Sequence, residues 1–562
     1  MSTVKWGRPA AGREPAGAAL LGWLADAAAP GLCLITGGAG CGKSALLAWL
    51  VRHGTRPGTG RERTVHSYVP LAGLSVHGAV WTMADQLALV ARGPGEFLAR
   101  LAADRRRVTI VLADLHAGAD PDGLAELVLA LDALDHVRLV VEIRSGTDVH
   151  RQLVGSAAAL MDLDEPQWTD EARRSAWHAD PTGATPPPGP ARQQIPAVVD
   201  FDDPAALCAA DPWLVTASFD ADQEEHGGLR AAWLRAGQSL CREQESAERA
   251  LVLLTALGDG ADPRLRPELA RLAATADWQL DWSRVRGDMA PPWPGPVFAM
   301  TTAGLSAGRV LLADHQGVLR TVDAADGSPV GRMPQLPSPP AAVCALTDGT
   351  VLALDDQGLL HKQTLPGVPG ATGIAALLDD GPALGQQLTE TITTHLARSP
   401  GTALCSTPGV MAVGGADGTV HTFTPGEPDE HPRGASLHIG PVTAMAAVDL
   451  PVGDGQGSVP LLYSGGADGR VRAWSPAADP QPTPVAEHTG PVTALTAGHT
   501  PSGLALAVAW ADGLIELHHP DKGRTRQLWP GAAVNALALT AGGSLLVGTD
   551  DRVMCLCPRW RG

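Results

Sequence analysis

The sequence is poor in lysine, and its charged residues carry an acidic excess. The net charge is −18, which argues against a protein that coats nucleic acid or an anionic membrane. The one conspicuous basic run, residues 105–107, stands just before an expected strand, where a solvated helix end is a simpler interpretation than a binding patch. Nucleic acid is therefore not expected as a partner. The lysines are Lys5, Lys43, Lys362 and Lys522.

Long apolar runs and metal-binding cysteine spacings are also missing. No uninterrupted apolar run reaches the length that spans a bilayer, and the first residues lack the apolar core of a signal peptide. The eight cysteines stand in no metal-ligand spacing, and Cys555 and Cys557 alternate along an expected strand. Small core side chains in a reducing compartment are the favoured interpretation. A cytoplasmic protein without a membrane partner is expected.

The length of the chain predicts a multidomain protein. At 562 residues it exceeds what one hydrophobic core serves, so about two to four domains are expected. With 44% hydrophobic and 18% charged residues it can bury sizeable cores, which excludes a disordered protein as a whole.

A strand, a glycine-rich loop and a helix follow one another over residues 32–50, LCLITGGAGCGKSALLAWL. The pattern G-x-x-x-x-G-K-[ST] begins at Gly37 and ends at Ser44. Glycine lets backbone N–H groups surround a polyphosphate, Lys43 reaches its β/γ-phosphates, Ser44 ligates Mg²⁺, and the helix adds its positive N-terminal dipole. The pattern predicts bound ATP or ADP with Mg²⁺; the alternative is an ordinary glycine-rich turn. The predicted nucleotide-binding residues here are Gly37, Gly38, Ala39, Gly40, Cys41, Gly42, Lys43 and Ser44.

Strands and helices alternate after this loop. Strands are expected near 64–71, 108–113 and 137–143, with helices near 76–90, 96–104 and 122–134. Such alternation predicts an α/β domain with a parallel sheet, helices on both faces and ligands at the carboxyl ends of the strands.

Two charged residues at strand ends are the predicted catalytic residues. Asp114 ends one strand, where it would organise Mg²⁺ and the attacking water, and Arg144 follows the next strand, where it would sense the γ-phosphate. The alternative for both is a charged residue that merely ends a strand. His116 is interpreted as a surface loop histidine.

The order of Gly12-Arg13-Glu14, the glycine loop, IVLADLH and an arginine after the next strand resembles the STAND class of signalling NTPases, multidomain relatives of AAA-type ATPases. The resemblance covers roughly the first half of the chain and implies a nucleotide site that includes Arg13. It departs at Ala113, where the class commonly has the first acid of Asp-Asp-Leu-His. The Mg²⁺-side carboxylate is then missing while Asp114 keeps the position that polarises water, which implies slow hydrolysis or a switch without efficient turnover.

A proline-rich stretch follows the α/β region and is interpreted as an exposed linker or loop. Helical patterns at 204–218, 228–242, 247–256 and 267–275 suit the helical arm and winged-helix-like piece that the resemblance implies. Pro212 resembles the proline that packs near the adenine in that class; a proline at a core boundary is the alternative. The last of these helices is poor in basic residues, so the segment is interpreted as a lever between domains rather than a DNA reader.

The last half of the chain repeats an apolar strand, an acidic turn and an alternating strand. The turn acids recur mostly near the spacing of about 40–45 residues typical of a propeller blade. His438, His488 and Trp474 stand in sequences that resemble WD repeats. The 62-residue step from Asp355 to Asp417 is too long for one unit. A seventh blade is therefore predicted in residues 373–397, with six blades and a helical insertion as the alternative. The turn acids are Asp314, Asp355, Asp417, Asp468, Asp512 and Asp550.

These observations predict three domains: a P-loop NTPase domain (1–165), a helical arm with a proline-rich linker (166–290) and an all-β, WD-repeat-like propeller (291–562). The predicted function is an ATP- or ADP-binding switch, at most a weak ATPase, whose propeller senses a protein partner. Output would come from a separate effector protein, homo-oligomerisation is left open, and a role in bacterial defence is implied by the resemblance alone. The alternative is a non-hydrolysing propeller scaffold with a degenerate nucleotide site.

Overall fold

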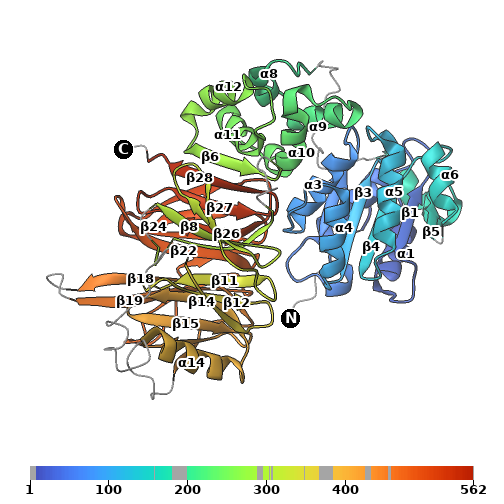
Figure 1. Cartoon of the computed structure of the whole chain (residues 1–562). Coiled ribbons are helices and arrows are strands. Elements are labelled where there is room, and N and C mark those ends of the chain that lie inside the picture. Colours follow the sequence, from blue (N-terminus) through green and yellow to red (C-terminus); the bar gives the residue numbers. More distant parts are fainter. Residues whose placement is uncertain are drawn as a thin grey trace, which may run out of the picture. The chain divides into compact units, whose positions relative to one another are not determined.

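The computed structural model describes residues 8–156, 158–179, 199–287, 295–302, 304–305, 308–346, 348–365, 384–424, 432–452 and 457–560 (Figure 1). The chain divides into two compact units, Met1–Glu224 and Glu225–Gly562. Their boundary falls inside residues 166–290, for which one helical arm is expected. Most of the proline-rich stretch lies outside the described residues.

The first unit contains a five-stranded parallel sheet in the order β2-β3-β4-β1-β5. Strands β1, β3 and β4 are buried along their whole length, as parallel strands covered on both faces must be. The order reverses beside β1, because β4 pairs with one edge of β1 and β5 with the other. Ligands of such sheets bind at this reversal. The strands are β1 (Leu32–Thr36), β2 (Ser67–Pro70), β3 (Val108–Ala113), β4 (Val137–Glu142) and β5 (Ala159–Asp162).

Helices cover this sheet. Apolar side chains of α1 and α2 form one core with Ile35, Val111 and Val140 of the central strands. Helices α3, α4 and α5 contact one another, α3 contacts β2 and α5 contacts β4 (Figure 1). The predicted α/β alternation is confirmed. The helices are α1 (Glu14–Ala25), α2 (Lys43–Gly54), α3 (Val76–Gln86), α4 (Pro94–Ala103), α5 (Pro121–Asp132), α6 (Asp148–Val154), α7 (Glu171–Ala179), α8 (Pro204–Ala209) and α9 (Pro212–Ala221).

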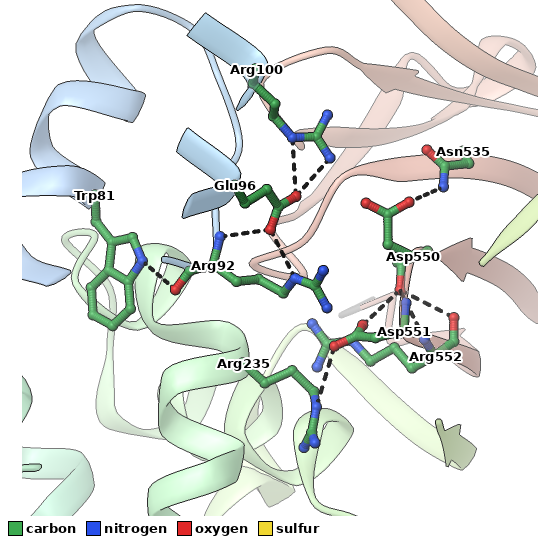
Figure 2. Close-up of polar contacts among 10 residues, drawn as sticks. Trp81, Arg92, Glu96, Arg100, Arg235, Asn535, Asp550, Asp551 and Arg552 are labelled. Atoms are coloured by element: carbon green, nitrogen blue, oxygen red, sulfur yellow. Dashed lines mark hydrogen bonds and ion pairs between the residues drawn. The ribbon is translucent and has the colours of Figure 1, made fainter. Parts of the chain in front are cut away.

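A carboxylate holds the connection between α3 and α4. Glu96 accepts hydrogen bonds from the backbone N–H and Nε of Arg92 and from Arg100, while Trp81 Nε1 donates to the Arg92 carbonyl (Figure 2). The segment joining the two helices is therefore tied to both of them.

The second unit is a β-propeller preceded by three packed helices. Helix α11 contacts α10, α12 and strand β6. Six sheets form the propeller, and their innermost strands β7, β11, β14, β18, β22 and β26 contact one another in succession, the last contacting the first. The ring is thus closed by six blades. The helices are α10 (Leu229–Leu240), α11 (Ser246–Ala256) and α12 (Leu265–Leu272).

The blades follow the order of the chain, except that the last contains β6 (Trp278–Val285). The first three are β7 (Val297–Thr301), β8 (Arg309–Asp314), β9 (Leu319–Asp323) and β10 (Pro329–Arg332); β11 (Pro340–Ala345), β12 (Thr350–Asp355) and β13 (Leu360–Thr364); and β14 (Gly401–Thr407), β15 (Val410–Gly415), β16 (Thr419–Phe423) and β17 (Arg433–Ser436). The last three are β18 (Val442–Val452), β19 (Gly457–Gly466), β20 (Arg470–Trp474) and β21 (Ala486–Glu487); β22 (Val492–Thr500), β23 (Gly503–Trp510), β24 (Ile515–His519) and β25 (Arg524–Leu528); and β26 (Val534–Leu539), β27 (Leu545–Thr549), β28 (Arg552–Pro558) and β6.

Each turn acid lies at the end of the second strand of its blade or in the turn that leads to the third. Asp314 and Asp355 each accept hydrogen bonds from the backbone N–H groups two and four residues on. Asp417, Asp468 and Asp512 accept from the N–H two residues on. Their interpretation as turn formers holds for these five acids.

The prediction of a seventh blade is wrong. Residues 373–383 of that segment lie outside the described residues, and the rest form helix α14 (Leu384–Leu396). Leu388, Ile392 and Leu396, spaced four residues apart, pack into a core between the second and third blades. The apolar residues of this segment fit both a period of two and a helical period, and burial of one helix face decided between them.

The helices of the second unit are anchored to the last blade. Arg235 Nε lies 3.3 Å from Asp551 Oδ2 (Figure 2). Ser239 Oγ donates to the carbonyl of Trp529, in the segment that leads into that blade, at 2.6 Å. Arg552 is fully buried, and its Nη1 donates to Thr255 Oγ1 of α11 at 3.4 Å. Helices α10–α12 therefore belong to the propeller unit, where a lever between domains was expected. In the part of the chain that the structure describes, no helix is long and apolar enough to cross a membrane.

Candidate phosphate-binding site

The glycine loop, residues 37–44, connects β1 to α2 at the carboxyl edge of the parallel sheet. Gly37, Gly40 and Gly42 have φ values of 137°, 74° and 98°, in the region that favours glycine. A Cβ on Gly37 would lie 2.6 Å from Cys41 Sγ. No side chain caps α2 at Gly42, so its first backbone N–H groups face the loop without a side-chain acceptor. The loop thus has the curvature and the amide donors that suit an anion.

Lys43 lies beneath this loop and is only 6% exposed. Its Nζ donates to the carbonyl oxygens of Gly37 at 2.9 Å and of Gly38 at 2.7 Å. The ammonium group is therefore held against the curved backbone that the sequence pattern assigns to phosphate.

Arg13 lies behind the loop and braces its backbone. The guanidinium is 4% exposed and donates to the carbonyls of Leu163 and Cys41 and to Thr169 Oγ1. It thereby ties the loop to the segment that follows β5. The structure brings Arg13 to the predicted site, with its donors directed at protein acceptors.

An acidic side chain of the protein already accepts a hydrogen bond from one backbone amide of the loop. Gly38 N–H donates to Asp164 Oδ2 at 2.7 Å, and Asp164 is exposed, two residues beyond the end of β5. A carboxylate at this amide competes with a phosphate oxygen for the same donor. Asp164 belongs to no local motif, and its place just after a strand at the loop's edge of the sheet is the only signal that the sequence patterns offered for it.

Asp114 and Arg144 follow neighbouring strands at this same edge. Asp114 is half-buried with a left-handed backbone, φ 55°, a conformation that costs a non-glycine residue energy and is concentrated at functional sites. Arg144 is exposed. Burial first and the charge of Arg144 second lower the pKa of the His116 imidazole, so Arg144 and His116 are close enough to interact.

Glu142, the last residue of β4, is the site residue that the sequence analysis missed. It is 1% exposed and accepts a hydrogen bond from Ser44 Oγ at 3.0 Å. Burial, and next the negative charge of Asp114, raise the pKa of Glu142 to about 7. An acid inside the apolar run VRLVVEI was the available signal.

Pro212 lies apart from these residues in the sheet order. It is the first residue of α9, which contacts α3, and α3 contacts β2. Strands β3 and β4 separate β2 from β1 and its loop. The burial of Pro212 agrees with a proline at a core boundary.

The residues present fit a magnesium ion bound together with a nucleotide. Among the described residues, no group of three or more His, Cys, Asp or Glu side chains is arranged to hold a metal. Mg²⁺ does not need one, since proteins commonly bind it through one or two carboxylates, waters and the phosphates of a substrate. Ser44 is exposed, and the buried Glu142 next to it has one carboxylate oxygen, Oε2, without a hydrogen-bond donor in the described structure.

A small cavity lies among the inner strands of the propeller. The cavity has a volume of about 70 Å³ and is lined by the inner strands of all six blades, each of which contributes at least one alanine. Phe298, Thr443, Thr493 and Asn535 also line it. A space of this size holds a few water molecules.

No protein-family model matches the chain, and no curated protein does. Among solved structures, the chain is similar to the computationally designed Ika8 protein at 19% sequence identity, with 47% of this chain and 71% of that chain covered and a TM-score of 0.28. A TM-score this low carries no argument, so the functional conclusions depend on the geometry of the chain itself.

Proposed function

We propose that the glycine loop binds the phosphates of ATP or ADP, with Mg²⁺, and that the chain is a nucleotide-dependent switch of the STAND type. The observation that carries this proposal is the loop geometry. Three glycines with positive φ join a buried parallel strand to an uncapped helix, and Lys43 Nζ lies under the curve. Backbone amides, a helix N-terminus and one ammonium group then converge where a polyphosphate needs them.

Each polar residue at this edge has a role in the proposal. Lys43 neutralises phosphate charge, Ser44 presents its hydroxyl to the cation, and Asp114 accepts a hydrogen bond from the attacking water. Arg144 lies on the solvent side, where it reaches a terminal phosphate. When bound, the magnesium nucleotide would supply the phosphoanhydride that the water attacks, and we propose slow turnover at most.

The propeller is proposed to bind a protein partner, and a separate effector protein to carry the output. The support for this proposal is the closed ring of six blades, an architecture that commonly mediates contacts with other macromolecules. The winged-helix-like character of the arm, a cytoplasmic location, homo-oligomerisation and a role in bacterial defence remain predictions.

Binding of fluorescently labelled ADP to the full chain tests the proposal. We expect saturable binding by the wild type and a loss of about 10- to 100-fold in affinity for Lys43→Ala, since a hydrogen bond to a charged group is removed. Lys362→Ala, an exposed lysine of β13, is the control and should bind like the wild type. Equal affinity of Lys43→Ala and the wild type contradicts the proposal.

The second candidate is the scaffold with a degenerate nucleotide site, and one contact favours it. Asp164 occupies the Gly38 amide, so part of the loop is satisfied by the protein's own anion. Absence of any ADP or ATP binding by the wild type supports the scaffold. ATP turnover that disappears in Lys43→Ala excludes it.

A further inference from the structure

We propose that Glu142 is the carboxylate that faces the nucleotide-bound divalent cation, together with the Ser44 hydroxyl, in place of the acid that is missing at position 113. The inference rests on the proposed function and extends it to a residue on a different strand. It explains how the chain keeps a metal site although it has alanine where an acid is expected.

The register of the sheet places Glu142 beside Ala113. Strands β3 and β4 are parallel with Leu112 opposite Val141, so Ala113 and Glu142, each the last residue of its strand, are the next pair. Residues paired on neighbouring strands project to the same face of a sheet. Ala113 belongs to the core beneath α2, and Glu142 therefore projects toward α2 as well. Glu142 thus presents a carboxylate one strand away from position 113, on the same face of the sheet.

The contact with Ser44 confirms this direction. Ser44 is the second residue of α2, and its Oγ donates to Glu142 Oε1 at 3.0 Å. The carboxylate thus lies next to the hydroxyl that the loop pattern assigns to Mg²⁺. A hydroxyl and a carboxylate are both oxygen ligands of the kind that this cation prefers.

The second carboxylate oxygen of Glu142, Oε2, lacks a well-placed hydrogen-bond donor in the described part of the chain. Oε2 is buried and has no hydrogen-bond partner of good geometry within the described residues, and the backbone N–H of Asp114 makes only a smaller contribution that favours the charged carboxylate. A buried carboxylate oxygen without a partner is costly, and Glu142 stands in a strand whose other residues are mostly apolar. Lys43 donates to the loop carbonyls, so its ammonium group is not the partner of Oε2. A divalent cation bound at the loop would be such a partner.

A purely positional role is the competing explanation, in which Glu142 only orients the Ser44 hydroxyl. The two roles differ in one respect. If Glu142 only holds Ser44, then Glu142→Gln keeps the effect of Mg²⁺, because the amide oxygen of glutamine accepts the same hydrogen bond from Ser44 Oγ. If the charge itself serves the cation, then Glu142→Gln loses the effect, and a carboxylate placed at position 113, on the same face of the sheet, restores it.

The test compares the affinity of the full chain for fluorescently labelled ADP in excess EDTA and in excess Mg²⁺. We expect Mg²⁺ to tighten binding by the wild type about 10- to 100-fold. Glu142→Gln should keep the EDTA affinity and lose this gain. Asp148→Asn, which removes an exposed carboxylate from the start of α6, should keep the gain. Ala113→Asp/Glu142→Gln should recover most of it.

Each outcome decides the matter. Loss of the Mg²⁺ gain in Glu142→Gln with recovery in the double variant supports the inference. A Glu142→Gln protein that keeps the gain overturns the inference in favour of the positional role and leaves nucleotide binding intact. Loss without recovery also overturns it, because a carboxylate at position 113 would then not serve the cation. A wild type that does not bind labelled ADP overturns the proposed function and this inference together. If Glu142→Gln failed to fold, as judged by circular dichroism, recovery or loss in the double variant would decide.

Discussion

At the scale of residues, the candidate site combines groups that attract a phosphate with one that opposes it. Lys43 and the amides of the glycine loop are arranged for an anion, yet the Gly38 amide already donates a hydrogen bond to the carboxylate of Asp164. A phosphate oxygen can accept from the Gly38 amide only after the hydrogen bond to Asp164 is broken. The affinity of the site depends on how much this exchange costs.

Removing the Asp164 carboxylate should therefore strengthen nucleotide binding. We expect Asp164→Ala to raise the affinity for labelled ADP by about three- to tenfold, a modest gain because the carboxylate is exposed and water replaces it. Asp122→Ala, an exposed acid on α5, is the matched control and should leave the affinity unchanged. Equal or weaker binding by Asp164→Ala would show that the carboxylate does not compete with phosphate.

Local sequence patterns predicted some residues of the candidate site and missed others. The loop residues, Asp114 and Arg144 were selected because each belongs to a local pattern. Glu142 was missed because its role depends on residues 98 positions earlier in the chain, through the hydrogen bond with Ser44. No local pattern contains that relation.

At the scale of elements, strand β6 has the largest consequence. It pairs antiparallel with β28, so a strand from before the propeller completes the blade that ends the chain. Trp278 and Trp282 of β6 are buried, and their indole N–H groups donate to the carbonyls of Gln527 and Ala324. Ala324 follows the third strand of the first blade, so Trp282 joins the last blade to the first.

Truncating Trp282 should loosen this closure. We expect Trp282→Ala to lower the free energy of unfolding of the propeller by about 3–5 kcal/mol, as for other buried aromatic side chains. Trp282→Phe keeps most of the ring and loses the hydrogen bond to Ala324, so a loss of about 1 kcal/mol is expected. Urea unfolding followed by circular dichroism measures both. Equal stability of Trp282→Ala and the wild type would show that β6 does not hold the ring.

At the scale of the whole molecule, the unit that contains the propeller starts earlier in the chain than the propeller domain that the sequence predicts, because it includes β6 and the helices before it. Residues 291–562 were expected to form the propeller, whereas the unit that the contacts define begins at Glu225 and includes α10–α12 and β6. Arg235 of α10 pairs with Asp551 of the last blade (Figure 2). Arg552 of that blade donates a hydrogen bond to Thr255 of α11.

Two fragments test this boundary. We expect residues 225–562 to be expressed as a folded monomer with a cooperative thermal transition. Residues 291–562 lack β6 and leave one edge of β28 unpaired, so they should aggregate or associate through that edge. Size-exclusion chromatography and circular dichroism compare them. A monomeric, cooperatively folded 291–562 fragment would refute the role given to β6.

The sequence by itself determined the features that depend on neighbours along the chain. These are the α/β alternation, the glycine loop between β1 and α2, the turn acids of the blades and the helical patterns of the middle segment. Each of them follows from local periodicity or from the backbone preferences of glycine, aspartate and proline.

Only the tertiary structure decided the features that depend on distant residues. The apolar spacing of residues 384–396 permits a strand or a helix, and burial of Leu388, Ile392 and Leu396 against two blades selects the helix and with it six blades. Ring closure by β6 and the meeting of Glu142 with Ser44 both follow from strand pairing across long sequence separations. Pairing of this kind is set by the packing of the whole unit, because no local preference specifies which distant strand a strand will join.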